Sequence, residues 1–290
     1  MKHRKIRVLV LGATGMLGNS VFRLFSADDK YEAFGSIRSP KGMQYFPEKI
    51  SGNLIAGIDV LDPDQLLGLF ARVKPEIVIN CVGLIKQLDG AEDPLVALPI
   101  NAILPHRLSR LCEALGSRLI HISTDCVFSG EKGAYIESDV SDALDLYGKS
   151  KYIGELHDKE HVVTLRTSII GHELNTTYAL INWFLSQNGR VKGFSKAFFS
   201  GLPTIELARV IKDYVITQPD LHGLYHVSAD PVSKLNLLKL VAERYSKSIE
   251  IVPDDTVIID RSLVSDCFTS ECGYKAPPWN VLIDAMYRSQ

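Results

Sequence analysis

The sequence carries little excess charge of either sign. Its 290 residues include 32 lysines and arginines against 34 aspartates and glutamates, which gives a formal net charge of -2. Such a chain is a poor general binder of phosphate backbones, because that binding depends on many Lys and Arg contacts. We therefore expect no nucleic acid and no anionic membrane as partners, while a local pocket for a small phosphate ligand stays open.

Long apolar runs are also missing. No stretch reaches the length of about 20 apolar residues that a membrane-spanning helix needs. The start, MKHRKIRVLVLGATG, has the basic and apolar parts of a signal peptide, but Gly12 and Gly15 interrupt the apolar part and no clear cleavage pattern follows. A buried first strand explains this segment better, so we expect a soluble, cytoplasmic protein.

Cysteine is scarce, and its spacing argues against a disulfide framework or a CxxC site. The five cysteines are Cys81, Cys112, Cys126, Cys267 and Cys272. An odd number of unclustered cysteines predicts free thiols in a reducing compartment. The eight histidines show no metal-ligand spacing, so we expect no metal.

The composition is otherwise that of a globular protein, and strands and helices are predicted to alternate along the first half. Hydrophobic residues make up 46% and charged residues 23% of the chain. Strands are expected at 6–11, 31–37, 53–58, 76–80, 118–123 and 162–167. Helices are expected at 16–25, 63–73, 94–115 and 147–157, with Pro99 and Pro105 kinking or dividing the third. This alternation predicts an α/β fold with a Rossmann-type, doubly wound parallel sheet.

The second half is less regular. Helices are expected at 178–187, 204–217 and 233–246, and a strand at 223–228. The tail from Pro253 onward is predicted to be loop-rich and includes Pro277-Pro278-Trp279. Because no internal repeat or obvious linker separates the halves, we expect them to pack tightly with the functional site between them.

A glycine-rich turn between the first strand and the first helix predicts a dinucleotide site. Gly12, Gly15 and Gly18 form a GxxGxxG pattern there. Glycines allow a tight turn and a close approach to a pyrophosphate, which then meets the N-terminus of the helix. An NAD site usually places a carboxylate about 20 residues on, but that position is Arg38 and no carboxylate lies between Ala33 and Pro40. Unless Arg38 merely stacks on adenine, it favours NADP(H) over NAD(H).

Tyr147 and Lys151 predict acid–base chemistry. Their spacing of four places both side chains on one helix face. The preceding strand ends in Thr124, at the edge where open α/β sheets bind ligands. A nearby ammonium favours the phenolate, so Lys151 can tune the pKa of Tyr147, while Thr124 can hydrogen-bond the reacting oxygen.

At these residues the chain resembles the extended short-chain dehydrogenase/reductases, and within them the family of dTDP-4-dehydrorhamnose reductases and related nucleotide-sugar 4-ketoreductases. Nearly the whole chain takes part in this resemblance. The similar stretches are GATGMLG at 12–18, INCVG at 79–83, HISTDCVFSG at 121–130, YGKSK at 147–151, LRTSIIG at 165–171, LPTIELARVI at 202–211 and GYKAPPW at 273–279.

The resemblance implies a set of site residues and a domain layout. Thr124, Tyr147 and Lys151 match the family's catalytic triad. The glycine-rich turn, Arg38 and the resemblance together give the candidate cofactor contacts Gly12, Thr14, Gly15, Met16, Leu17, Gly18, Arg38, Asp59, Val60, Cys81, Val82, Gly83, Tyr147, Lys151, Thr167 and Ser168. Candidate substrate contacts are Asp125 and Cys126 beside Thr124, Lys86 and Gln87 after the fourth strand, and Trp183 on a later helix. A solvated loop for Lys86 and Gln87, and core or subunit packing for Trp183, stay open. A dinucleotide-binding domain would span 1–170, with a return at about 203–230. A smaller, mixed α/β substrate domain would span 171–290, mainly 171–202 and 231–290.

The implied reaction is NADPH-dependent reduction of the C4 ketone of a 4-keto-6-deoxy nucleotide sugar, in deoxysugar or cell-surface polysaccharide biosynthesis. Tyr147 would be the general acid, and Lys151 would also bind the nicotinamide ribose. Dimers are common among such relatives, which leaves a homodimer open.

Three alternatives remain at this point. Nucleotide-sugar 4,6-dehydratases carry Thr-Asp-Glu where this chain has Thr124-Asp125-Cys126, and a thiol is not an equivalent base. The 4-epimerases retain NAD, which fits poorly with Arg38. The regulatory subunit of methionine adenosyltransferase is a similar, non-catalytic binding protein, and some NADP sensors are too.

Overall fold

A computed structural model describes residues 4–86 and 90–290 of the chain. Seven strands form one parallel sheet in the order β11-β6-β5-β4-β1-β2-β3. They are β1 (Ile6–Leu11), β2 (Tyr31–Ile37), β3 (Leu54–Ala56), β4 (Ile77–Asn80), β5 (Arg118–Thr124), β6 (Val162–Thr167) and β11 (Gly223–His226). The strand order reverses between β1 and β4, as in dinucleotide-binding folds. The predicted Rossmann-type, doubly wound sheet is therefore confirmed.

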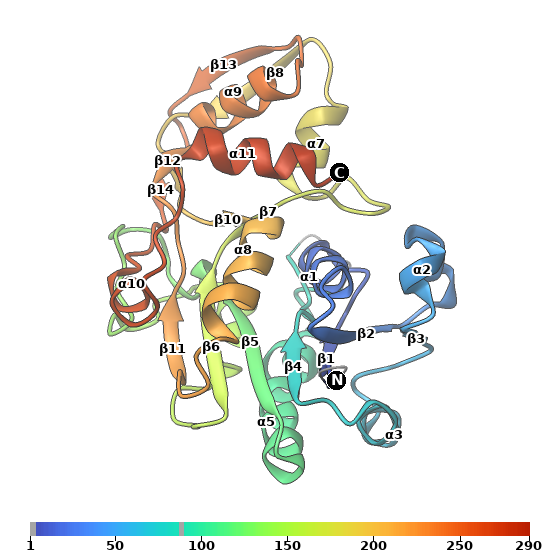
Figure 1. The fold of residues 1–290 in the computed structure, drawn as a ribbon. Helices are drawn as coiled ribbons and strands as arrows, with labels where there is room; N and C mark the ends of the chain where they lie inside the picture. Colours follow the sequence, from blue (N-terminus) through green and yellow to red (C-terminus); the bar gives the residue numbers. More distant parts are fainter. Residues whose placement is uncertain (1–3, 87–89) are drawn as a thin grey trace.

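Both faces of the sheet are buried, which explains the continuous apolar runs of its strands. Val8 and Val10 of β1 belong to one hydrophobic core, and Leu9 and Leu11 belong to another on the opposite face. The first core includes residues of α1 (Met16–Ser26) and α8 (Thr204–Val210), and the second includes residues of α3 (Pro63–Val73) and α5 (Leu104–Leu115). In Figure 1, α1 and α8 lie side by side.

The long helix over 94–115 is divided, as its two internal prolines predict. It consists of α4 (Pro94–Ala97), a π-helical segment (Leu98–Ile103) and α5. Pro105 has no N–H to donate to the carbonyl of Asn101, four residues earlier. That carbonyl faces Gly154, where an added Cβ would come within 2.1 Å of the Asn101 oxygen. The following helix, α6 (Leu146–Ile153), therefore ends in close contact with this segment.

The C-terminal part contains smaller sheets and a third core. Its strands pair as β12-β9-β14, β13-β8 and β10-β7. They are β7 (Ile169–Ile170), β8 (Arg190–Phe194), β9 (Ala197–Phe199), β10 (Leu202–Pro203), β12 (Val232–Ser233), β13 (Glu250–Asp254) and β14 (Ile259–Asp260). Figure 1 shows α7 (Leu180–Ser186), α9 (Lys234–Arg244) and α11 (Trp279–Arg288) grouped above the carboxyl ends of the large sheet. The predicted division into two domains with those boundaries stays a prediction.

The prediction of a loop-rich tail was wrong. Two helices, α10 (Asp266–Cys272) and α11, follow Pro253 together with β14. Pro278 directly precedes α11, and a proline is tolerated where a helix begins because the first N–H groups have no helical partner anyway. Short helical segments at Pro40–Tyr45 and Glu48–Ser51 (α2) were also not predicted. The helix expected at 147–157 ends at Ile153 because Gly154 packs against Asn101.

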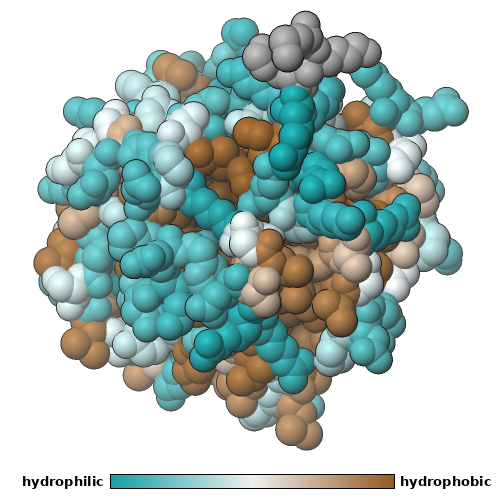
Figure 2. All heavy atoms as spheres, turned by 60° about the horizontal axis from the view of Figure 1, so that its bottom comes forward, coloured by the Kyte–Doolittle hydropathy of each residue, from teal (hydrophilic) through white to brown (hydrophobic). Residues whose placement is uncertain are grey.

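Within residues 4–86 and 90–290, no helix is long and apolar enough to cross a membrane. The face in Figure 2 shows teal hydrophilic side chains over much of its area, with brown hydrophobic patches between them.

Candidate active site

The glycine-rich turn folds as its pattern predicts. Gly12 follows β1 with φ of +78°, and its carbonyl accepts a hydrogen bond of 2.9 Å from the N–H of Gly15. A Cβ at Gly18 would lie 2.1 Å from the Gly12 oxygen, so only glycine lets α1 begin this close to β1. The first turn of α1 holds no acidic residue, and its N-terminus suits an anion.

The loop after β4 lies against the glycine-rich turn and against Lys151. A Cβ at Gly12 would meet Cγ2 of Val82 at 3.0 Å, and one at Gly83 would lie 3.9 Å from Nζ of Lys151. The glycine-rich turn, the loop containing Cys81 and helix α6 therefore converge where the strand order reverses. This is the position at which open α/β sheets bind ligands.

The remaining predicted cofactor residues lie at the start of α1 or after the carboxyl ends of strands. Met16 and Leu17 form the first turn of α1, and Thr14 packs against the Pro40–Tyr45 segment through Gly42. Arg38 is exposed at the end of β2. The others follow strand ends: Asp59 and Val60 after β3, and Thr167 and Ser168 at the end of β6.

The three predicted catalytic residues meet at the same edge of the sheet. Tyr147 and Lys151 lie on α6, whose first turn is capped by Asp145 Oδ1 accepting a 2.7 Å hydrogen bond from the Gly148 N–H. Thr124 is the last residue of β5 and pairs in register with Thr167. The Thr124 side chain lies close enough to Tyr147 to lower the pKa of the Tyr147 hydroxyl.

Burial controls the protonation of this group. Loss of water around the Tyr147 hydroxyl raises its pKa well above 10, and the neighbouring Thr124 side chain lowers it only in part. Burial likewise lowers the pKa of the Lys151 ammonium from 10.5 to about 8. Lys151 donates a 2.7 Å hydrogen bond to the Ile122 carbonyl. The expected lowering of the Tyr147 pKa by Lys151 is thus not the dominant effect, and Tyr147 is a protonated phenol, suited to act as an acid.

Two half-buried groups adjoin the predicted catalytic residues. Burial raises the pKa of the Asp125 carboxyl, and Thr124 donates to it over 3.1 Å. Burial raises the pKa of the Cys126 thiol to about 11. The Cys126 thiol therefore stays protonated at neutral pH and is not a base there. Within the described ranges, no three His, Cys, Asp or Glu side chains are placed to hold a metal ion.

The predicted substrate residues after β4 and on α7 are only partly described. Lys86 pairs with Asp145 over 2.5 Å and lies 5.3 Å from the ring centre of Tyr147. This position brings Lys86 next to the catalytic helix. Gln87 lies outside the described residues. Trp183 is on α7 and is 37% exposed.

Comparison with known proteins places the chain in a family. The family model described as RmlD substrate binding domain matches residues 6–259. The chain belongs to this family.

The similar proteins carry two different names. Methionine adenosyltransferase 2 subunit beta from Xenopus tropicalis is 24% identical over 96% of this chain and 80% of its own length. The dTDP-4-dehydrorhamnose reductase from Aggregatibacter actinomycetemcomitans is 26% identical over 78% of this chain and 74% of its own. A dTDP-4-dehydrorhamnose reductase from Bacillus anthracis, solved in complex with NADP, has a TM-score of 0.80 at 21% identity and covers 99% and 100% of the two chains. The predicted family is confirmed.

The sequence of this RmlD-family chain did not point to Arg261, which lies beside Cys126 in the structure. Its Nε donates a 2.7 Å hydrogen bond to the Phe128 carbonyl, and its Nη1 lies 3.8 Å from Sγ of Cys126. Its charge also lowers the pKa of Asp125, against the effect of burial. No local pattern marks Arg261, because its partners lie more than 130 positions earlier in the chain.

Proposed function

We propose that this chain is an NADPH-dependent oxidoreductase that reduces the C4 ketone of a 4-keto-6-deoxy nucleotide sugar. The observation that carries the proposal is the convergence of Thr124, Tyr147 and Lys151 beside the glycine-rich turn. Similarity to dTDP-4-dehydrorhamnose reductases supports the substrate class. A role in deoxysugar and cell-surface polysaccharide synthesis, a cytoplasmic location and a homodimer stay predictions.

The residues present fit a nicotinamide dinucleotide. Gly12 and Gly18 have the backbone approach that a pyrophosphate needs, and the α1 N-terminus favours its charge. Gly83 leaves the Lys151 ammonium within reach of a ribose hydroxyl. When bound, the cofactor supplies the hydride.

The residues of this chain supply position and a proton. Thr124 and Tyr147 would orient the ketone oxygen by hydrogen bonds, and Tyr147, kept protonated by burial, would donate its phenolic proton to that oxygen. The Lys151 ammonium, buried but still mostly charged below pH about 8, would stabilise the phenolate left behind.

The thiol of Cys126 favours a reductase over a dehydratase, which carries a Glu at this position. Elimination of water needs a base beside the acid. Burial raises the pKa of the Cys126 thiol to about 11, so it stays protonated at neutral pH. This supports reduction over dehydration.

The test is turnover of NADPH with a panel of dTDP- and UDP-linked 4-keto-6-deoxy sugars, followed through the nicotinamide absorbance band. We expect loss of absorbance with at least one substrate and a stoichiometric alcohol product. No turnover with any of them would overturn the reductase proposal.

Arg38 is proposed to bind the 2′-phosphate of NADP(H), because it is an exposed cation at the end of β2. Arg38→Ala should weaken NADPH binding by about tenfold or more, the worth of a charge-assisted hydrogen bond, and leave NADH binding nearly unchanged. The NADH titration is the internal control. If the variant lost affinity for NADPH and NADH equally, Arg38 would not bind the 2′-phosphate, and the preferred cofactor would be NAD(H).

A regulatory subunit is the second candidate. Similarity to methionine adenosyltransferase 2 subunit beta extends over 96% of this chain and supports it. Mixing the protein with a methionine adenosyltransferase catalytic subunit, with sedimentation and activity as readouts, separates the two proposals. A stable complex without sugar-nucleotide turnover would favour the regulatory role.

A further inference from the structure

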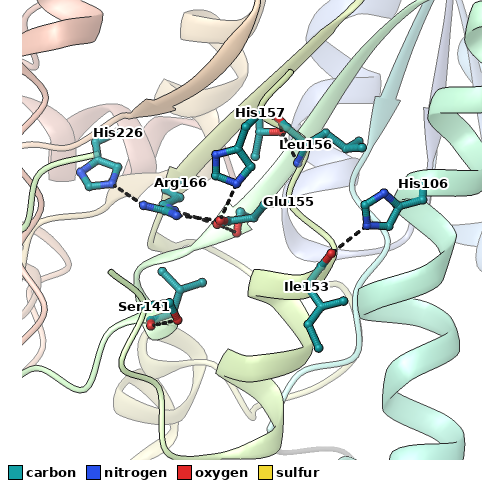
Figure 3. Close-up of polar contacts among 11 residues, drawn as sticks. His106, Ser141, Ile153, Glu155, Leu156, His157, Arg166 and His226 are labelled. Atoms are coloured by element: carbon teal, nitrogen blue, oxygen red, sulfur yellow. Dashed lines mark hydrogen bonds and ion pairs between the residues drawn. The ribbon is translucent and has the colours of Figure 1, made fainter. Parts of the chain in front are cut away.

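A fully buried ion pair lies behind the proposed catalytic residues. The Glu155 and Arg166 side chains are 0% and 1% exposed. Arg166 donates to the Glu155 carboxylate twice, from Nε over 2.8 Å and from Nη2 over 2.7 Å. Figure 3 shows this two-pronged contact, with His157 also pointing toward the Glu155 carboxylate.

Every part of this pair has a partner. Ser123 Oγ donates to Glu155 Oε1 over 2.6 Å. The third guanidinium nitrogen of Arg166 lies 3.3 Å from Nε2 of His226, and its carbon lies 5.2 Å from the Phe128 ring centre. The polar groups of Glu155 and Arg166 are therefore all engaged, and we call this set with Ser123 and His226 the junction.

The junction joins three elements that carry proposed catalytic or cofactor residues. Glu155 follows the end of α6, four residues after Lys151. Ser123 precedes Thr124 on β5, and Arg166 precedes Thr167 on β6. In the sheet register, Ser123 faces Arg166 and Thr124 faces Thr167.

Stability alone does not account for such a pair. Removing two charges from water costs several kcal/mol per ion, and buried ion pairs are often replaced by apolar side chains with no loss of stability. Removing only one partner is strongly destabilising, because it leaves the other charge buried. What the pair adds over an apolar contact is direction, since each of its hydrogen bonds fixes a distance and an angle.

We propose that Glu155 is a positioning residue of the active site, which holds the ends of β5 and β6 at a fixed distance from α6 through Ser123 and Arg166. It thereby sets where Thr124 lies relative to Tyr147 and Lys151. This inference rests on the proposed reductase function.

The charge of Glu155 adds a second effect. Burial lowers the pKa of the Lys151 ammonium to about 8, and the Glu155 carboxylate opposes that lowering. Besides Tyr147, the titratable groups near Lys151 include Cys81 after β4 and His121 in β5. Burial would raise the pKa of Glu155 itself, but hydrogen bonds from Arg166, His157 and Ser123 bring it below 4.5, so its charge persists at neutral pH.

The main experiment replaces the pair by apolar side chains of similar size, Glu155→Leu with Arg166→Met. We expect the melting temperature to stay near that of the wild type, the affinity for NADPH to change less than about threefold, and kcat to fall by about 10²-fold, as misplacement of catalytic groups by about 1 Å can cause. Wild-type kcat in a folded double variant would overturn the proposal.

A single variant, Glu155→Gln, tests the charge and keeps the shape. It leaves Arg166 unpaired, so the melting temperature should fall, and the alkaline limb of kcat/KM should move to lower pH as Lys151 loses the Glu155 carboxylate. Asp284→Asn is the matched control, because it breaks the 2.7 Å Arg244–Asp284 pair between α9 and α11. The control should change neither kcat nor the pH profile.

Cofactor binding separates failure of this proposal from failure of the proposed function. The dissociation constant of NADPH, measured by nicotinamide fluorescence against pH, should rise where Lys151 deprotonates and should do so at lower pH in Glu155→Gln. Absence of sugar turnover in the wild type would contradict only the reductase proposal. A binding profile that the variant leaves unmoved would contradict the role of Glu155.

Discussion

The two sides of the candidate site are built from different kinds of group. On the cofactor side, Gly12 and Gly18 bring backbone atoms close together, and the α1 N-terminus supplies the electrostatics. On the reaction side, Thr124 and Lys151 are buried, and Tyr147 is half-buried against them. The cofactor side therefore depends on backbone shape, whereas the reaction side depends on protonation and charge. Changes on the two sides should have different signatures.

The largest effect should come from removing the proposed acid on the reaction side. Tyr147→Phe deletes the phenolic proton and leaves the ring, so kcat should fall by about 10² to 10⁴-fold while NADPH binding is largely kept. Tyr152→Phe is the control on the same helix, since Tyr152 is 41% exposed. Turnover by Tyr147→Phe at the wild-type rate would mean that another group donates the proton.

The cofactor side can be broken by one methyl group. Gly18→Ala would place a Cβ 2.1 Å from the Gly12 oxygen, so the turn must shift. We expect a loss of about 1–3 kcal/mol in the free energy of unfolding from overpacking. NADPH binding should weaken by at least about tenfold, without a change in the pH profile of the remaining activity.

The matched control for that prediction is Gly68→Ala. Gly68 lies within α3, and nothing lies within 4 Å of an added Cβ there. This variant should raise the free energy of unfolding by about 0.5–1 kcal/mol, because alanine is the better helix former. Calorimetry and nicotinamide fluorescence measure both effects. Equal behaviour of the two variants would show that close packing at Gly18 is not what the turn requires.

A contrast between local and long-range features also explains how much of the fold could be predicted from the sequence. Strands β1, β2 and β6 begin and end where expected. For β1 the reason is its apolar run, which is buried on both faces and leaves a strong local signal. The two-residue strands β12 and β14 were missed because they exist only through pairing with β9.

The site divides in the same way. Gly12 and the Tyr147–Lys151 spacing are local patterns, so they could be found in the sequence. The contacts of Arg261 with Phe128 and Cys126 depend on the folding of distant segments. Glu155 is intermediate, since its spacing of four from Lys151 is local but its contact with Arg166 requires the sheet.

The smallest and most specific effect should be a pH dependence confined to the reaction side. Burial lowers the pKa of Lys151 from 10.5 to about 8, so the ammonium is charged below that pH and neutral above it. Because the charged form is proposed to stabilise the Tyr147 phenolate, kcat/KM should be halved near pH 8 and fall about tenfold per pH unit beyond it. Binding of 2′-phospho-ADP-ribose, which lacks the nicotinamide half, should stay constant over the same range because it tests only the cofactor side. A plateau of kcat/KM that extends to pH 10 would exclude Lys151 as the titrating group. If kcat/KM and the binding of 2′-phospho-ADP-ribose fell in parallel, the pH dependence would not be confined to the reaction side.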